Sequence, residues 1–212
     1  MKLYSYWRST AAYRVRVALG LKGIEYDYEP VNLVRDGGEQ HSAEYRAKNP
    51  QGLVPLLEHN GIRINQSLSI IRYLDETFPE PTLYSDDPVL NAKIDSFALS
   101  ICADIHPLNN LRVLNYLTTE LQHDPEQKQV WYHHWLKHGF DSLEVILREA
   151  NSSYCLTDYP SVADICLVAQ VYNARRFQFD LSAYPVIVEK EQLCLQHSAF
   201  AQSIPEKQID AE

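Results

Sequence analysis

Hydrophobic and polar residues alternate differently in the two parts of the chain. In residues 1–82, short apolar stretches typical of strands are separated by segments with helical spacing. The predicted strands are 3–6, 26–33, 54–58 and 62–65, and the predicted helices are 10–22, 43–48 and 68–79. Asn60-Gly61 is typical of a tight turn between the last two strands. The order βαβ followed by ββα predicts an α/β domain.

The remainder of the chain shows only helical spacing. Long amphipathic helices are predicted at 90–108, 130–150 and 161–177, with a shorter helix at 186–200 and a frayed tail at 204–212. Pro79, Pro81 and Pro88 separate the two patterns and mark a linker. We therefore expect an α/β domain over residues 1–82 and an all-α domain over residues 88–212.

The composition narrows the class of protein. The 212 residues are 45% hydrophobic and 22% charged, which is typical of a soluble globular protein. No apolar stretch is long enough to cross a membrane, and the opening MKLYSYWRST does not resemble a signal peptide. The formal charge of −9 argues against nucleic acid or an anionic membrane as a partner. The four cysteines show no metal-ligand spacing, so we expect free thiols in the cytoplasm and no bound metal.

The first 24 residues differ in charge from the rest of this acidic chain. They contain five basic residues and no acidic one. The basic residues are Lys2, Arg8, Arg14, Arg16 and Lys22. A site for a small anion and a helix whose arginines form salt bridges both fit this pattern.

Pairs of polar residues stand at the start of two predicted helices. Ser9 or Thr10 can cap the first of them, but capping requires only one hydroxyl. A hydroxyl at a helix N-terminus can also donate a hydrogen bond to a thiolate and lower the thiol pKa. Ser67 is expected to cap the helix at 68–79, and a carboxylate bound there would also explain Gln66.

Val54-Pro55 begins a predicted strand. A proline at this position forms either an ordinary trans turn or a cis peptide bond. In a βαβ-ββα module it leaves the preceding N–H and C=O free to pair with an extended peptide.

Polar motifs in the helical part have structural explanations. Ser161 and Asp164 have the spacing of a capping box, and Arg176 can complement a helix dipole. The cluster of His133, His134 and His138 lacks a third ligand with metal-site geometry, so we expect it on a solvated helix face.

Taken together, the βαβ-ββα module, Val54-Pro55, Gln66-Ser67 and the all-helical second part resemble the soluble glutathione transferases. Further motifs are similar to the zeta class, the family of the maleylacetoacetate isomerases. They are Arg8 to Arg16, Leu33 to Gln40 with Asp36-Gly37-Gly38, Asn49-Pro50-Gln51, and Gln170 to Phe177. The resemblance covers nearly the whole chain and implies a thioredoxin-like first domain followed by the family's all-α domain.

The resemblance also implies roles for individual residues. Ser9 would stabilise the thiolate of glutathione, Thr10 stands in place of a second family serine, and Arg176 would act on the carboxylates of an acidic substrate, assisted by Arg8 or Arg14. The residues implied to bind glutathione or to approach the ligand are Ser9, Thr10, Gln40, Val54, Pro55, Gln66, Ser67, His106, Asn110 and Arg112.

The implied activity is a glutathione-dependent cis-trans isomerisation of maleylacetoacetate to fumarylacetoacetate, in tyrosine and phenylalanine catabolism, by reversible thiolate addition. The implied assembly is a homodimer, and the implied substrate is a small acidic cis-enone diacid. Maleylpyruvate isomerisation, general zeta-class glutathione conjugation, and a non-catalytic binding or stress protein remain as alternatives.

Further positions besides Thr10 depart from the family pattern. Ala11 stands where the family often has a cysteine, so the chemistry is expected to rest on glutathione itself. His106 and Arg112 replace residues usual in the animal enzymes. Arg112 fits a second substrate-binding cation and a solvated side chain equally well.

Overall fold

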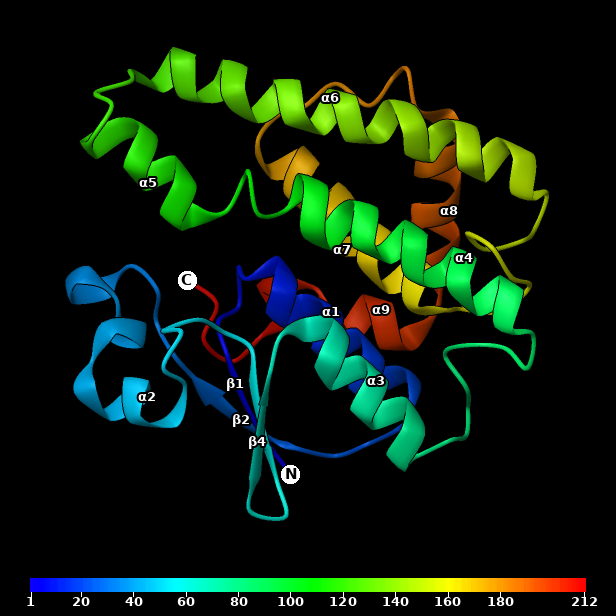
Figure 1. Cartoon of the computed structure of the whole chain (residues 1–212), viewed down its shortest axis with the longest axis horizontal. Coiled ribbons are helices and arrows are strands. Elements are labelled where there is room, and N and C mark those ends of the chain that lie inside the picture. Colours follow the sequence, from blue (N-terminus) through cyan, green and yellow to red (C-terminus); the bar gives the residue numbers. More distant parts are fainter. The chain divides into compact units, whose positions relative to one another are not determined.

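Four short strands form one mixed sheet with the order β2-β1-β3-β4 (Figure 1). The strands are β1 (Lys2–Ser5), β2 (Asp27–Pro30), β3 (Leu56–His59) and β4 (Ile62–Asn65). β1 is parallel to β2 and antiparallel to β3, which forms a hairpin with β4. The computed structural model describes all 212 residues, and this topology confirms the predicted βαβ-ββα order.

Helices lie on both sides of the strands. α1 (Thr10–Leu21) and α3 (Ser67–Thr77) pack against each other on one side, and α2 (Ala43–Lys48) lies on the other (Figure 1). α1 ends just before Gly23, whose φ of 63° favours glycine. The predicted helices at 10–22 and 43–48 are therefore confirmed to within one residue.

Alternating side chains of β1 account for this two-sided cover. Leu3 and its register partner Leu57 are completely buried. Tyr4 points to the opposite face, where its ring meets that of Tyr45 in α2 edge to face at 6.0 Å. The sheet therefore has a hydrophobic core on each face, which fixes the register of β1.

The C-terminal segment belongs to the same unit as the sheet. The chain divides into one unit of Met1–Leu83 with Leu195–Glu212, and a second unit of Tyr84–Cys194. α9 (Ser198–Ser203) packs against α1 and buries Phe200. This differs from the predicted second domain of residues 88–212, because a buried apolar face on α9 returns the chain to the first unit.

The predicted fraying of residues 204–212 is wrong. The carboxylate of Asp210 accepts hydrogen bonds from the Trp7 N–H at 3.1 Å and the Tyr28 hydroxyl at 2.6 Å. Glu212 accepts from the Arg35 guanidinium at 3.0 Å. Polar contacts to Trp7, Tyr28 and Arg35 hold this tail, and its own composition gave no sign of them.

The second unit is all-helical, as predicted. Its helices are α4 (Pro88–Leu99), α5 (Leu111–Thr119), α6 (Pro125–Ala150), α7 (Val162–Arg176) and most of α8 (Pro185–Gln196). The single helix predicted over 90–108 is wrong in its second half. After α4 the chain widens into a π-helical turn, Ser100–Ile105, in which the His106 N–H donates to the Ile101 carbonyl.

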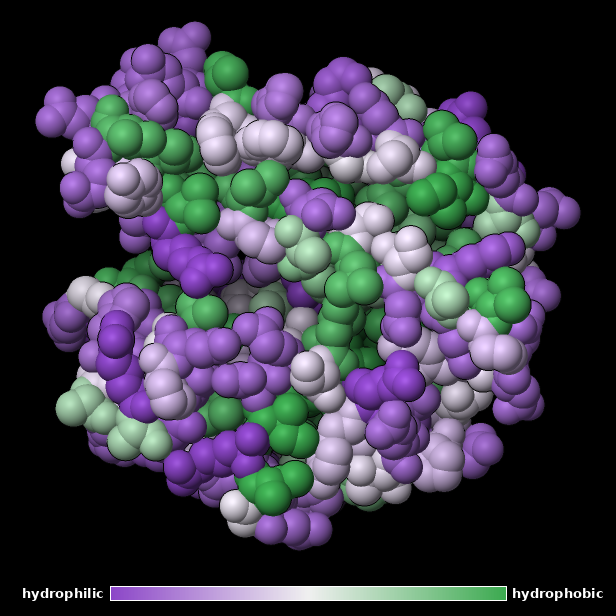
Figure 2. All heavy atoms as spheres, in the orientation of Figure 1, coloured by the Kyte–Doolittle hydropathy of each residue, from purple (hydrophilic) through white to green (hydrophobic).

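The surface of the helices is mixed in character. Figure 2 shows hydrophobic side chains over α5 interspersed with polar ones. Leu111 and Tyr116 on α5 are 39% and 56% exposed. None of the helices combines the length and the apolar character needed to cross a membrane.

Candidate active site

The start of α1 places the Ser9 hydroxyl at the carboxyl end of β1. Ser9 is the N-cap of α1, and its Oγ accepts a hydrogen bond from the Ala12 N–H at 3.2 Å. The backbone N–H of Ser9 donates to the Tyr6 carbonyl at 2.9 Å. Because the cap uses only an acceptor site of Oγ, the hydroxyl proton remains available to an anion. Thr10 is the first residue of α1 and is 4% exposed.

The start of α3 is arranged differently from the prediction. Gln66, not Ser67, is the N-cap, and it provides no side-chain capping hydrogen bond. The Ser67 hydroxyl instead accepts from Nη1 of Arg14 at 2.9 Å. The prediction of Ser67 as the cap is wrong because Gln66 holds a positive φ of 67° at the boundary, which leaves Ser67 as the first helical residue.

Arg14 brings a buried positive charge to this helix start. Its side chain is on α1, is 2% exposed, and leaves its Nε without a hydrogen-bond partner. Together with the uncapped N–H groups of α3, it forms a site suited to a carboxylate. The sequence predicted for Arg14 only a possible role in assisting Arg176. Its position four residues after Thr10, on the same face of the helix, was the available signal.

Val54 and Pro55 supply free backbone beside β3. The Val54-Pro55 peptide bond is cis. The preceding Leu53 carbonyl accepts from the Tyr45 hydroxyl at 2.7 Å and from Asn49 Nδ2 at 2.8 Å. The N–H and C=O of Val54 itself make no hydrogen bond within the chain, so they are available to pair with an extended peptide.

Gln40 and Gln66 present amide side chains in the same unit. Gln40 is 7% exposed, and its Oε1 has no hydrogen-bond partner, whereas its Nε2 donates to the Leu33 carbonyl at 3.3 Å. The exposed Gln66 donates from Nε2 to Gln51 Oε1 at 3.0 Å. Gln51 was not among the predicted site residues.

These features of the first unit fit a tripeptide with an anionic end. A buried arginine with an unpaired Nε, the uncapped start of α3 and the free backbone of Val54 are complementary to carboxylate and peptide groups. Glutathione has both kinds of group.

In the second unit, three of the predicted residues gather at the start of α5. Asn110 is its N-cap and accepts from the Arg112 N–H at 3.2 Å, and its Nδ2 lies 3.5 Å from Nε2 of His106. The side chain of Arg112 is exposed. The helix predicted over 90–108 ended before Asn110, and the structure makes Asn110 the cap of a separate helix that the spacing did not predict.

Arg176 lies at the C-terminal end of α7. Its neighbour Arg175 forms an ion pair with the buried carboxylate of Glu191, and this interaction raises the pKa of Arg175. Arg176 forms no ion pair and lies with its guanidinium carbon 5.2 Å from the centre of the Phe177 ring. Of the two adjacent arginines, Arg176 is thus the one with its charge available to a ligand.

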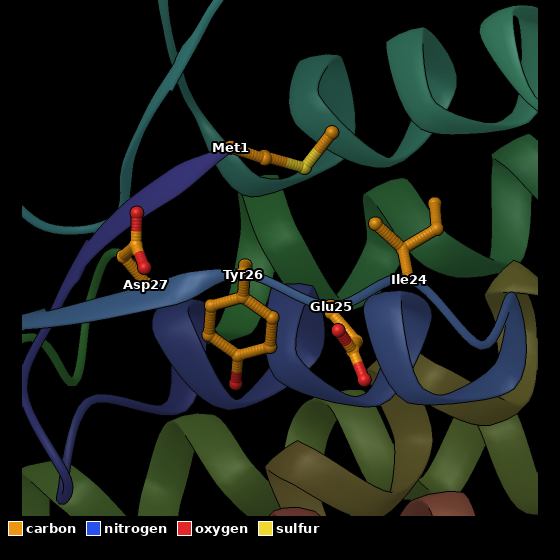
Figure 3. Close-up of a pocket in the computed structure, with 5 residues that line it drawn as sticks. All are labelled: Met1, Ile24, Glu25, Tyr26 and Asp27. Carbon is orange, nitrogen blue, oxygen red and sulfur yellow. The ribbon is translucent and has the colours of Figure 1, made fainter.

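A cavity of about 500 Å³ lies at the amino ends of β1 and β2, away from Ser9 at the carboxyl end of β1 (Figure 3). It is lined by Met1 and by residues 24–27, which precede or begin the parallel strands β1 and β2. Ligands of α/β sheets bind at the carboxyl ends of strands, and the carboxylates of Glu25 and Asp27 do not favour an anionic ligand. We therefore do not assign the active site to this cavity. No group of His, Cys, Asp and Glu side chains in the structure could hold a metal ion.

Comparison with known proteins decides the family. Residues 3–82 match the model of the glutathione S-transferase N-terminal domain. The chain is 48% identical over 209 residues to the probable maleylacetoacetate isomerase of Vibrio cholerae, covering 99% of this chain and 97% of that protein. The chain belongs to the glutathione transferase family.

Solved structures place the chain more closely within this family. The holo structure of maleyl pyruvate isomerase, a bacterial zeta-class glutathione transferase, matches with a TM-score of 0.97 at 38% identity and covers both chains completely. Maleylacetoacetate isomerase from Methylobacterium extorquens, solved with malonate and glutathione, matches with a TM-score of 0.95 at 34% identity, again over both whole chains. These matches confirm the zeta-class resemblance and the fold of a thioredoxin-like domain followed by an all-α domain.

Proposed function

We propose that this protein is a glutathione-dependent cis-trans isomerase that converts maleylacetoacetate to fumarylacetoacetate. The observation that carries the proposal is the start of α1, where the capping geometry of Ser9 leaves its proton available to a thiolate. Full-length relatives named maleylacetoacetate isomerase support the choice of substrate, among them the enzyme of Pseudomonas aeruginosa at 45% identity. The reaction belongs to tyrosine and phenylalanine catabolism.

The residues of the first unit would hold glutathione as the cofactor. The uncapped start of α3, with Ser67, Gln66 and Arg14, is suited to its γ-glutamyl carboxylate. The backbone of Val54, next to Pro55, is suited to its cysteinyl peptide group. When bound, glutathione supplies a thiolate whose reversible addition turns the cis double bond into a rotatable single bond.

Residues of this protein would stabilise the negative charges on the thiolate and on the substrate during the reaction. The Ser9 hydroxyl donates toward the sulfur, and the field of α1 at Thr10 favours the same negative charge. Lowering the thiol pKa by one unit corresponds to about 1.4 kcal/mol. Arg176 would hold the substrate carboxylates and the enolate-like charge, and Asn110, His106 and Arg112 would approach the bound ligand.

Arg14 is assigned here to glutathione and not to the substrate. Its Nη1 already bonds the Ser67 hydroxyl, and its burial leaves it little freedom to turn. Arg8 is exposed, with its guanidinium carbon 4.1 Å from the centre of the Trp7 ring. Arg8 is therefore the candidate to assist Arg176.

We also propose that the protein acts in the cytoplasm as a homodimer. Its four cysteines are all free thiols, which suits a reducing compartment. Light scattering on the purified protein measures the mass, and a mass of one chain would reject the dimer.

The decisive experiment measures glutathione-dependent isomerisation of maleylacetoacetate beside maleylpyruvate. We expect faster turnover of maleylacetoacetate and loss of most activity in Ser9→Ala. Ser42→Ala is the matched control, because Ser42 caps α2 with the same geometry, accepting from the Tyr45 N–H at 3.1 Å. A preference for maleylpyruvate would change the substrate and leave the mechanism intact. Absence of turnover with both would favour a binding protein.

A further inference from the structure

The C-terminal tail is bonded directly to the loop that carries Ser9. Asp210 Oδ2 accepts the Trp7 N–H at 3.1 Å, and its Oδ1 accepts the Tyr28 hydroxyl at 2.6 Å. Trp7 precedes Ser9 by two residues, between the end of β1 and the start of α1. Figure 1 shows the C-terminus near this end of the sheet and the N-terminus at the opposite end. The carboxylate thus bridges β2 and the Ser9 loop.

A buried cation holds the same loop from a second direction. Arg16 is 1% exposed, and its guanidinium donates to the carbonyls of Trp7 at 3.1 Å and Tyr6 at 3.4 Å, and to the Ser5 hydroxyl at 3.2 Å. Its Nε donates to the carbonyl of Ser203 at the end of α9. The C=O of Trp7 is therefore fixed by Arg16 and its N–H by Asp210.

These two contacts determine where Ser9 lies. The Ser9 N–H bonds the Tyr6 carbonyl, which also accepts from Arg16. A displacement of the peptide between Tyr6 and Trp7 is transmitted directly to the Ser9 hydroxyl. Catalytic geometry tolerates little displacement, because a shift of about 1 Å can cost about a hundredfold in rate.

Charge supports the arrangement. Burial lowers the pKa of Arg16, and the nearby Asp210 carboxylate acts in the opposite direction and favours the charged guanidinium. The Tyr28 hydroxyl donates to Asp210, and burial raises the pKa of Tyr28 above its ordinary value, so this hydroxyl keeps its proton at alkaline pH as well.

We propose that Asp210 is a positioning residue for Ser9, through its hydrogen bond to the Trp7 amide. This inference rests on the proposed function, in which Ser9 stabilises the glutathione thiolate. It assigns the last turn of the chain to the active site of the first unit, although Asp210 itself touches no substrate.

The experiment measures the pKa of bound glutathione from the ultraviolet absorbance of its thiolate, together with kcat as a function of pH. We expect Asp210→Ala to raise the pKa of the bound thiol by about one unit. We also expect kcat at neutral pH to fall severalfold, with about tenfold as the limit for one pKa unit, and to recover at alkaline pH, because the thiolate fraction is restored there. Glutathione affinity should change less than twofold, since Arg14 and Ser67 are not moved.

Three further variants make the test specific. Asp210→Asn should rescue most of the effect, because an amide can accept from Trp7 and donate to the Tyr28 oxygen. Glu212→Ala is the tail control, since it removes only the contacts to Asn32 and Arg35, and it should leave the thiol pKa unchanged. If Asp210→Ala does not fold, Tyr28→Phe replaces it, because this change frees one side of the carboxylate and should raise the thiol pKa in the same direction.

An unchanged thiol pKa and pH profile in a folded Asp210→Ala or Tyr28→Phe variant would overturn the proposal. So would a loss of thermal stability with no shift of the profile, since the tail would then serve folding alone. A wild-type protein that does not lower the thiol pKa would instead contradict the proposed function. The two failures are therefore distinguishable.

Discussion

Helices α7 and α3 begin in opposite ways. At the start of α7, Asp164 Oδ2 accepts from the N–H and the hydroxyl of Ser161 at 2.9 and 2.8 Å, and its Oδ1 accepts from the Cys155 N–H at 2.8 Å. At the start of α3, no side chain caps the helix, and Arg14 keeps an unpaired buried Nε. The polar groups at the start of α7 have hydrogen-bond partners within the chain, whereas the start of α3 keeps polar groups without partners.

This difference separates a folding role from a ligand-binding role. Burial raises the pKa of Asp164, and its hydrogen bonds act in the opposite direction, so the carboxylate depends on its partners in the folded chain. Buried polar groups left without partners reduce stability unless a ligand supplies what is missing. The comparison therefore predicts that changes at α7 affect unfolding and that changes at α3 affect glutathione binding.

The largest effect should come from Asp164→Ala. This change leaves four donors without their acceptor in a completely buried place: two backbone N–H groups, the Ser161 hydroxyl and the Cys194 thiol. We therefore expect the free energy of unfolding to fall by about 3 kcal/mol. Urea unfolding followed by circular dichroism measures it. The control is Asp158→Ala, since Asp158 also accepts two hydrogen bonds, from Ser153, but is exposed. Equal losses in the two variants would remove the distinction between a buried and an exposed hydrogen-bonded carboxylate.

The next largest effect should come from Arg14→Met. We expect glutathione affinity to fall by about 2 kcal/mol, roughly thirtyfold, because a desolvated guanidinium binds a carboxylate strongly. The stability of the ligand-free protein should change by less than about 1 kcal/mol, because removing a buried charge with no acidic partner also removes its desolvation cost. Calorimetric titration and urea unfolding measure the two quantities.

Arg16→Met provides the control for Arg14→Met. Arg16 is equally buried but donates to four acceptors within the chain, so its loss should lower the free energy of unfolding by about 3 kcal/mol. If Arg14→Met destabilised the ligand-free protein as much as Arg16→Met, the start of α3 would be a folding site after all.

The smallest effect should come from Gln66→Gly. Gln66 holds a φ of 67°, so glycine should raise the free energy of unfolding of the ligand-free protein by about 0.5 kcal/mol. Loss of the amide should at the same time weaken glutathione binding about threefold, or roughly 0.7 kcal/mol. Asn60→Gly, a glycine substitution at a φ of 49° in the hairpin turn, is the control and should leave glutathione affinity unchanged. A Gln66→Gly variant with unchanged affinity would show that the amide does not contribute to binding.

Local pattern was sufficient for the first unit up to α3. The strand alternation, the Asn60-Gly61 turn and a cap at Ser9 or Thr10 depend on neighbouring residues, and the structure confirms the first two and selects Ser9 as the cap. The break between α4 and α5 was missed because Ile101 and Ile105 continue the apolar spacing through the π-helical turn. Spacing alone cannot distinguish a π turn from an α-helix that continues.

The sequence predicted which residues are candidates for the site better than it predicted the contacts between them. The positions of Ser9, Ser67 and Val54 followed from motifs, but the bond between Arg14 and Ser67 joins residues 53 positions apart. Asp210 and Trp7 are separated by 203 positions. Such pairings are set by how the elements pack, and a single sequence contains no local signal of them.

The discontinuous first unit also has a consequence for synthesis on the ribosome. The strands of this unit lie within Met1–Leu83, whereas α9 and the tail, which complete the unit, lie within Leu195–Glu212. At about 5–20 residues per second, the intervening helical unit takes about 5 to 20 s to translate. During that interval the nascent sheet lacks the Asp210 carboxylate that accepts from the Trp7 N–H, so the loop before Ser9 gains its full set of contacts only after α9 and the tail have been translated.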